Sequence, residues 1–318
     1  MAAARIRSTA GSATTACGAG ALAGRRIGVY AHSAVGRDLL AGLLANLGAA
    51  VVALGRSDTF IPVDTEAVDP ETRAQIADWV REHALDALVS TDGDSDRPLL
   101  ADETGALVPG DILGQITAQA LGAEVVVTPI SSNSGVSRKG FARVVTTRIG
   151  SPFVIAGMQA AGGRVVGYEA NGGFLLGFAA QGPAGPLAPL PTRDAVLPLL
   201  MGLIAGKDGL AARVAREPPV VTLADRLAEV PQERSQPFVA ALAGDAAARA
   251  AFLSQLGAAE AATDLTDGVR MRLADGRIVH VRPSGNAPEL RLYVEAPTRE
   301  GAGALMRAGL GALRRAVG

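Results

Sequence analysis

The sequence predicts an α/β protein: two consecutive mixed, mainly parallel α/β sandwich domains, then a C-terminal α+β domain with an antiparallel sheet. Two observations lead to this prediction. Short apolar strand patterns alternate with helix-length patterns from residue 26 to residue 168, which favours parallel strands joined by helices. After residue 216 the alternation stops, and Asp275-Gly276 joins two strand patterns as a hairpin signal.

The first α/β domain, residues 24–109, follows a leader that the sequence predicts to be disordered, residues 1–23. The leader has no acidic residue and no periodic apolar pattern, so it buries too little surface to order itself. Asp69 before Pro70 is a strong helix start in this domain. The expected elements are strands 26–30, 50–54 and 87–90 and helices 35–47 and 70–83.

The second α/β domain is expected over residues 110–216 and the α+β domain over residues 217–318. Asp111 is the expected cap of the first helix of the second domain, and residues 181–191, with four prolines, are an expected surface loop or flap. The remaining expected elements are strands 124–128, 143–147, 164–168, 269–273, 277–281 and 290–296 and helices 152–161 and 300–317.

Composition excludes several classes of function. Hydrophobic residues are 48% and charged residues 19% of the 318 positions, as in globular proteins. The net charge of −1 provides no basic field for nucleic acid or an anionic membrane, so neither is an expected partner. The longest apolar run, residues 195–205, is too short to cross a bilayer. The single Cys17 forms no intramolecular disulfide, which favours a reducing, cytoplasmic location.

The most informative segment is Asp92-Gly93-Asp94-Ser95-Asp96-Arg97, which follows the expected strand 87–90. Three carboxylates within five residues repel one another unless a cation neutralises them, and a hard divalent metal such as Mg²⁺ prefers such oxygen ligands. An EF-hand calcium loop is a second interpretation, because Glu103 stands at its twelfth position, but Arg97 replaces the glycine that this loop needs. A solvated acidic turn is the third interpretation, and the segment alone leaves it open.

Two further loops carry polar groups suited to a phosphosugar. Arg282, Ser284, Gly285 and Asn286, followed by Arg291, combine guanidiniums with backbone and side-chain donors that fit a phosphate. Glu169 and Asn171 follow the expected strand 164–168, where a carboxylate and an amide bind neighbouring sugar hydroxyls. Taken singly, the loop 282–286 is as compatible with an ordinary turn as with a phosphate site, and an ordinary turn with a surface glutamate is the favoured interpretation of the Glu169 loop.

Together the three loops resemble those of the α-D-phosphohexomutases, the family that includes phosphomannomutase and phosphoglucomutase. The resemblance covers about residues 24–318. It implies that Asp92, Asp94 and Asp96 hold Mg²⁺ and that Arg97 supports catalysis. It also implies that Glu169 and Asn171 bind the sugar and that the loop 282–286 with Arg291 binds phosphate. Residues 148–151 lie where the family often contributes further contacts. The implied activity is an isomerase that moves a phosphoryl group between the 1- and 6-positions of a hexose phosphate through a phosphoserine.

One part of the family pattern is missing from the sequence. The family's first domain carries the phosphoserine in a Thr-x-Ser-His-x-Pro loop, and none of the three histidines stands in such a context. We therefore expect a chain that corresponds to the second, third and fourth domains, with no catalytic serine identified. Three hypotheses follow: a mutase polypeptide that is truncated or complemented by a separate first domain, a non-catalytic phosphosugar-binding protein, or a Mg²⁺-dependent phosphatase with an aspartate nucleophile.

Overall fold

The computed structural model describes residues 14–285 and 287–318, and these divide into two compact units. The first unit contains residues 14–129, 136–145 and 150–217, and the second contains residues 130–135, 146–149 and 218–318. The domain limits at residues 109 and 216 stay predictions, and each unit is described by itself below.

The first sheet of the first unit has the order β2-β1-β3-β4-β5. Strand β1 pairs in parallel with β2 and with β3, whereas the pairs β3–β4 and β4–β5 are antiparallel. The strands and helices of this part are β1 (Arg26–Tyr30), α2 (Arg37–Asn46), β2 (Ala50–Leu54), α3 (Pro70–Glu82), β3 (Ala87–Thr91), β4 (Pro98–Ala101) and β5 (Leu107–Val108).

The alternation of apolar side chains along β1 and β3 decides how the two helices cover this sheet. Ile27 and Val89 join the apolar cluster that contains the buried residues of α2, whereas Leu88 joins the cluster of α3. Since neighbouring residues of a strand point to opposite faces, α2 and α3 cover opposite faces. Asp69 caps α3 as expected, because its side chain accepts a 2.8 Å hydrogen bond from Thr72 N.

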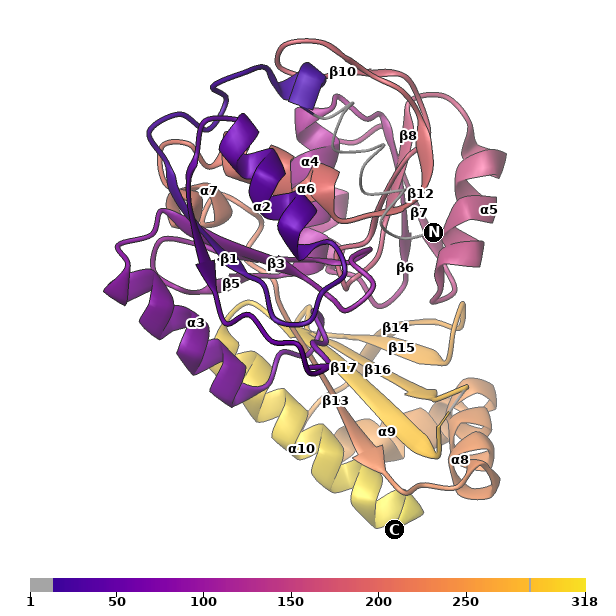
Figure 1. The fold of residues 1–318 in the computed structure, drawn as a ribbon. Coiled ribbons are helices and arrows are strands. Elements are labelled where there is room, and N and C mark those ends of the chain that lie inside the picture. The colour runs from indigo at the N-terminus through magenta and orange to yellow at the C-terminus, as the bar shows by residue number, and fades with distance from the viewer. Residues whose placement is uncertain (1–13, 286) are drawn as a thin grey trace. The chain divides into compact units, whose positions relative to one another are not determined.

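The second sheet of the first unit has the order β12-β9-β8-β6-β7. It is also mixed, because β6 and β8 are parallel while β9 runs antiparallel to β8 and β12. Figure 1 shows α4 and α6, which contact each other, beside this sheet. The elements are α4 (Gly110–Ala120), β6 (Val125–Pro129), β7 (Arg143–Thr147), α5 (Ser151–Ala161), β8 (Val165–Tyr168), β9 (Phe174–Leu176), β10 (Ala180–Gln181), β11 (Pro186–Leu187), β12 (Leu190–Asp194), α6 (Val196–Ala205) and α7 (Leu210–Val214).

The second unit is built on an antiparallel sheet of order β13-β17-β16-β15-β14. Its long helix α10 packs along β13 and β17 (Figure 1). The elements are β13 (Val221–Ala228), α8 (Gln232–Gly244), α9 (Ala246–Ser254), β14 (Glu260–Asp264), β15 (Val269–Leu273), β16 (Ile278–Pro283), β17 (Glu289–Ala296) and α10 (Arg299–Val317). A 3-10 turn, η1 (Ser134–Arg138), begins within the segment 130–135 of this unit and ends in the first unit. Mixed α/β sheets and an antiparallel C-terminal sheet confirm the predicted fold class.

Two local expectations are wrong. Residues 14–23 of the expected leader are packed into the core, where Ala16 and Leu22 are buried and Leu22 N donates a 2.9 Å hydrogen bond to Leu47 O. Residues 1–13 of that leader lie outside the described residues. Asp111 is not a cap, because α4 begins one residue earlier and Asp111 stands in its first turn.

The flap expected over residues 181–191 begins at the end of β10, contains β11 and ends with the first residues of β12. Among the residues that the structure describes, none of the helices combines the length and the apolar character needed to span a bilayer.

Candidate functional site

The acidic segment forms the tight connection between β3 and β4, at the carboxyl end of the parallel strands of the first sheet. The Asp92 side chain organises this turn: its Oδ1 accepts hydrogen bonds from the backbone N–H groups of Asp96 and Arg97, both at 3.1 Å. The backbone N–H of Asp92 donates to Arg97 O at 3.1 Å. These bonds hold the three aspartates in one compact loop.

Ser95 fixes the strained part of this turn. Its φ of +63° lies in the left-handed region, which a residue with a side chain adopts only where its surroundings enforce it. The buried Ser95 Oγ accepts a 3.0 Å hydrogen bond from Gly36 N and another, also of 3.0 Å, from Thr91 Oγ1. The loop is therefore preorganised from both sides rather than solvated like an ordinary acidic turn.

The three carboxylates converge closely enough to hold one cation. One oxygen from each of Asp92, Asp94 and Asp96 lies within 4.8 Å of the others, with Asp94 exposed and its two neighbours buried. Burial, reinforced by the charges of Asp94 and Asp96, raises the pKa of Asp92 to about 6. Burial raises the pKa of Asp96 as well, against the opposing effect of Arg193. A bound divalent cation would remove this repulsion.

The donor set fits Mg²⁺. The Asp96 Oδ1 atom is buried and has no hydrogen-bond partner among the described residues, and it lies 3.8 Å from Arg97 Nε. A buried carboxylate oxygen without a hydrogen bond is unfavourable, and a hard cation with oxygen ligands would satisfy it.

The Glu169 loop lies in the same unit and follows β8. Glu169 is buried, which raises its pKa, while Arg193, Arg97 and a hydrogen bond from Ser151 act in the opposite direction. Asn171 Oδ1 accepts a 3.0 Å hydrogen bond from Gly173 N, so this part of the amide shapes the turn.

Two contacts from other segments hold this loop in place. Thr65 Oγ1 donates to Asn171 O at 3.0 Å. The start of α4 also approaches closely, since a Cβ atom added at Gly110 would lie 2.4 Å from Gly172 N and 2.6 Å from Ala170 O. Position 110 therefore requires glycine if the loop is to keep its place.

Arg193 of β12 connects the aspartate loop to the Glu169 loop. Its Nη2 lies 2.6 Å from Asp96 Oδ2, and its Nη1 lies 3.9 Å from Glu169 Oε2. Arg193 is not among the residues predicted from the sequence, because nothing near it along the chain indicates its partners. The available signal is weak: an arginine two residues after the expected proline-rich flap, just before an apolar run.

The charges of this group agree with a cation site. The carboxylates are Asp92, Asp94, Asp96 and Glu169, and the guanidiniums are Arg97 and Arg193. When all six groups are ionised, the four carboxylates and two guanidiniums have a net charge of −2. One divalent cation would neutralise this charge.

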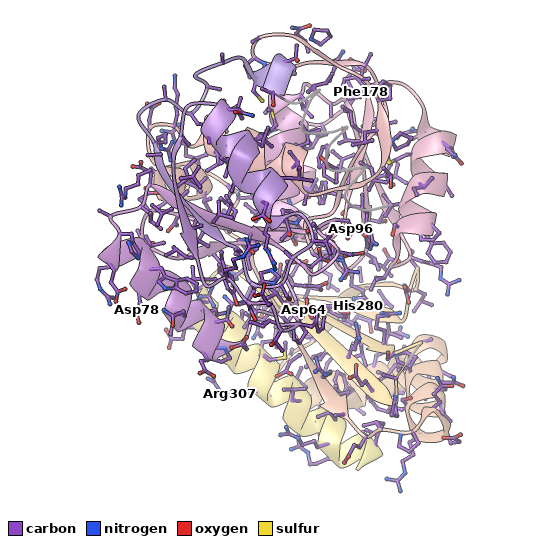
Figure 2. All side chains as sticks on the ribbon, in the orientation of Figure 1. Asp64, Asp78, Asp96, Phe178, His280 and Arg307 are labelled. Atoms are coloured by element: carbon purple, nitrogen blue, oxygen red, sulfur yellow. The ribbon has the colours of Figure 1, made fainter. Side chains whose placement is uncertain are left out.

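An open pocket of about 600 Å³ adjoins the aspartate loop. Figure 2 labels Asp96 of this loop and Asp64 of the pocket wall. The lining residues are Ser33, Val35, Phe60, Pro62, Val63, Asp64, Asp92, Gly93, Asp94 and Arg97. Phe60 is 71% exposed, so the pocket has an apolar rim beside its acidic floor. A polar ligand that reaches the carboxylates has room to enter here.

The expected phosphate loop belongs to the second unit, where it joins β16 to β17. Arg282 and Arg291 are direct cross-strand partners, which places two guanidiniums on neighbouring strands. Each also has a carboxylate partner: Arg282 Nε lies 3.3 Å from Asp267 Oδ1, and Arg291 Nη2 lies 3.3 Å from Glu289 Oε2.

The turn between these two strands contains the remaining predicted residues. Ser284 is buried, and its backbone N–H donates to Glu289 O at 2.8 Å. A Cβ atom at Gly285 would meet nothing within 4 Å, so the backbone there is open to an approaching group. Asn286 lies outside the described residues. The structure thus brings the aspartate and Glu169 loops together in one unit and places the phosphate loop in the other.

Comparison with protein families gives three matches, all to domains of one family. Residues 12–105 match phosphoglucomutase/phosphomannomutase, alpha/beta/alpha domain II, and residues 101–213 match alpha/beta/alpha domain III. Residues 223–308 match the C-terminal domain of the same family.

Two relatives are phosphomannomutases. The chain is 46% identical to the phosphomannomutase of Sinorhizobium fredii over 303 residues, which are 93% of this chain and 64% of that protein. It is 42% identical to the phosphomannomutase of Salmonella muenchen over 299 residues, 88% of this chain and 60% of that protein. The chain thus spans less than two thirds of the length of these relatives.

Solved structures agree on the fold. A phosphoglucomutase/phosphomannomutase family protein from Burkholderia thailandensis superposes with a TM-score of 0.72 at 16% identity, over 99% of this chain and 64% of that one. The N-acetylphosphoglucosamine mutase of Aspergillus fumigatus, in complex with GlcNAc-6P and magnesium, superposes with a TM-score of 0.59 at 17% identity. This match covers 94% of this chain and 64% of that one.

Proposed function

Because the chain belongs to the phosphoglucomutase/phosphomannomutase family, we propose that it forms the metal- and sugar-binding part of a phosphohexomutase of the phosphomannomutase type. The reaction would move a phosphoryl group between the 1- and 6-positions of a hexose phosphate. The observation that carries this proposal is the group formed by the aspartate loop and Glu169, which Arg193 joins within one unit.

Each loop would have a separate task. Asp92, Asp94 and Asp96 would hold Mg²⁺, which supplies charge neutralisation to a phosphoryl group in transfer. The magnesium in the structure of the Aspergillus relative supports this choice of ion. Glu169 would accept hydrogen bonds from sugar hydroxyls, and its burial would strengthen them.

The second unit would bind a phosphate group of the sugar through the loop 282–286 and Arg291. The paired guanidiniums on neighbouring strands suit the bidentate contacts that a phosphate prefers. Asp267 and Glu289 would give up part of their contact with these arginines when the phosphate binds.

The phosphoserine of the mutase reaction would come from a region outside these 318 residues, either on the same polypeptide or as a separate domain. No Thr-x-Ser-His-x-Pro motif stands in the sequence, which supports this part of the proposal. The single cysteine, buried in the core, supports a reducing, cytoplasmic setting.

Isothermal titration calorimetry with Mg²⁺ tests the metal loop. We expect Asp94→Asn to weaken Mg²⁺ binding at least about tenfold, because even residues behind metal ligands change affinity by this factor. Asp94 is exposed, so the substitution should leave the fold intact. Asp78→Asn is the matched control, since the Asp78 side chain on α3 is 47% exposed and pairs with Arg81. Equal Mg²⁺ affinity of Asp94→Asn and the unchanged chain would contradict the proposed site.

The sugar phosphate is tested with mannose 1-phosphate. We expect calorimetry to show binding that strengthens with Mg²⁺, and ³¹P NMR to show no conversion to mannose 6-phosphate by the chain alone. Conversion by the chain alone would contradict the external phosphoserine. If binding persists when a phosphorylated first domain is added but conversion never appears, the non-catalytic phosphosugar-binding hypothesis is the better one.

A further inference from the structure

Arg193 occupies a position that the three predicted loops leave unexplained. Its guanidinium is directed at two carboxylates from different loops, Asp96 at 2.6 Å and Glu169 at 3.9 Å. The two contacts use different nitrogens, Nη2 for Asp96 and Nη1 for Glu169. The side chain is 26% exposed, whereas those of Asp96 and Glu169 are 9% and 7% exposed. The group is therefore shielded enough from solvent for its electrostatic interactions to be strong.

The backbone around Arg193 is shaped to direct its side chain between the two loops. Strand β12 pairs with β9 through Leu190 and Asp194, and the register shifts between these two positions, so Arg193 lies on a bulged section of the strand. Bulges change the direction of a side chain at functional sites. Glycine at position 173 leaves space for the aliphatic part of the Arg193 side chain. A Cβ atom at position 173 would lie 3.1 Å from Arg193 Cδ and 3.3 Å from Arg193 Cγ.

The two carboxylate oxygens of Asp96 have different surroundings, and this difference indicates the role of Arg193. Oδ2 faces Arg193, whereas the buried Oδ1 has no hydrogen-bond partner among the described residues. One oxygen is thus held by the guanidinium, and the other is available to a cation. A guanidinium has fixed fork geometry, so an Asp96 carboxylate anchored by a cation would also fix the nitrogen that faces Glu169.

We propose that Arg193 is a positioning residue that couples the metal carboxylate Asp96 to the sugar-binding carboxylate Glu169. A cation at the aspartate loop would order Asp96, and through Arg193 it would order the turn that begins at Glu169. The proposal rests on the proposed function for the roles of the two loops. An ordinary structural ion pair would stabilise the fold but would not transmit metal binding from one loop to the other.

Hydrogen exchange with Mg²⁺ as the probe tests this coupling without any sugar. The backbone amides of Gly172 and Gly173 report on the turn, because they donate to Glu169 O and to Asn171 Oδ1. We expect Mg²⁺ to slow exchange in peptides covering residues 92–97 and also in those covering residues 169–173, the latter on the order of fivefold, a typical coupling between two sites.

Arg193→Lys is the decisive variant. Lysine keeps the positive charge but provides a single ammonium instead of the fork, so Mg²⁺ should still protect residues 92–97 while protection of residues 169–173 falls to less than about twofold. Arg56→Lys is the matched control, since Arg56 pairs with Asp38 at 2.7 Å on the exposed surface of the same unit, and it should behave like the unchanged chain.

The outcomes separate this proposal from the one on which it rests. If Mg²⁺ protects residues 92–97 but not residues 169–173 in the unchanged chain, the coupling is absent and the role of Arg193 is overturned. The same holds if Arg193→Lys retains full protection of the Glu169 turn. If Mg²⁺ protects neither loop, the proposed metal site itself is wrong, and the coupling fails with it. Should Arg193→Lys be unstable, Arg193→Gln replaces it, with the same expected loss of protection at residues 169–173.

Discussion

His280 should make the second unit lose stability as the pH falls below neutrality. This imidazole on β16, labelled in Figure 2, is 1% exposed and points to the face of the sheet opposite Val279 and Val281. Its Nε2 donates a 2.6 Å hydrogen bond to Asp267 O, and the ring stacks on Tyr293 with a centroid distance of 5.3 Å. Burial lowers the pKa of His280 to about 4, and Arg270 and Arg282 act in the same direction, against Asp267.

The direction of the effect follows from proton linkage. The unfolded chain protonates His280 near pH 6.5, whereas the folded chain protonates it only near pH 4. Above pH 6.5 both states are neutral at this position and the stability is complete. Between pH 6.5 and pH 4 only the unfolded state binds the proton, so the stability falls as the pH falls. At 1.36 kcal/mol for each unit of pKa difference, the loss is about 2 kcal/mol at pH 5 and about 3 kcal/mol at pH 4.

Hydrogen exchange at pH 7 and pH 5 measures this loss where it occurs. The free energy of opening for peptides from β16 and β17 should fall by about 2 kcal/mol more in the unchanged chain than in His280→Gln, whose amide still donates to Asp267 O. Comparing the two proteins cancels the contributions of the carboxylates and of His32. An equal decrease in both proteins would refute the reasoning, since it would mean that His280 is protonated alike in the folded and unfolded states.

Substitutions at Asp69, Gly114 and Gly110 test the local packing of the first unit, with Asp69→Asn and Gly42→Ala as controls. Urea unfolding followed by Trp79 fluorescence measures the stability of the first two sites, and ligand binding tests Gly110. Asp69→Ala should lower the free energy of unfolding by about 1 kcal/mol through loss of the α3 cap, whereas Asp69→Asn should change little. Gly114→Ala should cost about 1–3 kcal/mol, because its Cβ would lie 2.5 Å from the Tyr168 ring, whereas Gly42→Ala, with nothing within 4 Å on the exposed side of α2, should stabilise by about 0.5–1 kcal/mol. Gly110→Ala should weaken mannose 1-phosphate binding more than Mg²⁺ binding, and equal weakening of both would contradict the contact between α4 and the Glu169 turn.

The elements that the sequence predicts well are those whose signals are local. Strands 26–30, 50–54 and 269–273 have the expected bounds, because short apolar runs between turn residues need no knowledge of distant partners. The start of α3 is also as predicted, since Asp69 and Pro70 determine it within one turn. The aspartate loop was found for the same reason, because its three carboxylates lie within five residues of one another.

The leader shows where local signals fail. Residues 14–23 contain mostly small side chains without periodicity. Such a segment cannot bury enough apolar surface to become ordered by itself. In the fold they meet surfaces contributed by other segments, such as Leu47 at the end of α2, and the backbone hydrogen bond from Leu22 holds them there. Their order is a property of the tertiary structure.

What the sequence determined by itself is the order of the elements and the kind of chemistry in each loop, because both depend on residues close together in the chain. Only the tertiary structure decided which loops share a unit and what joins them. Arg193 lies 97 positions after Asp96 and 24 after Glu169, and no pattern along the chain links the three. The pairing of β12 with β9 carries Arg193 to the sheet that holds the Glu169 turn, and packing within the unit brings Asp96 to 2.6 Å from it, since such contacts join segments that are distant in sequence.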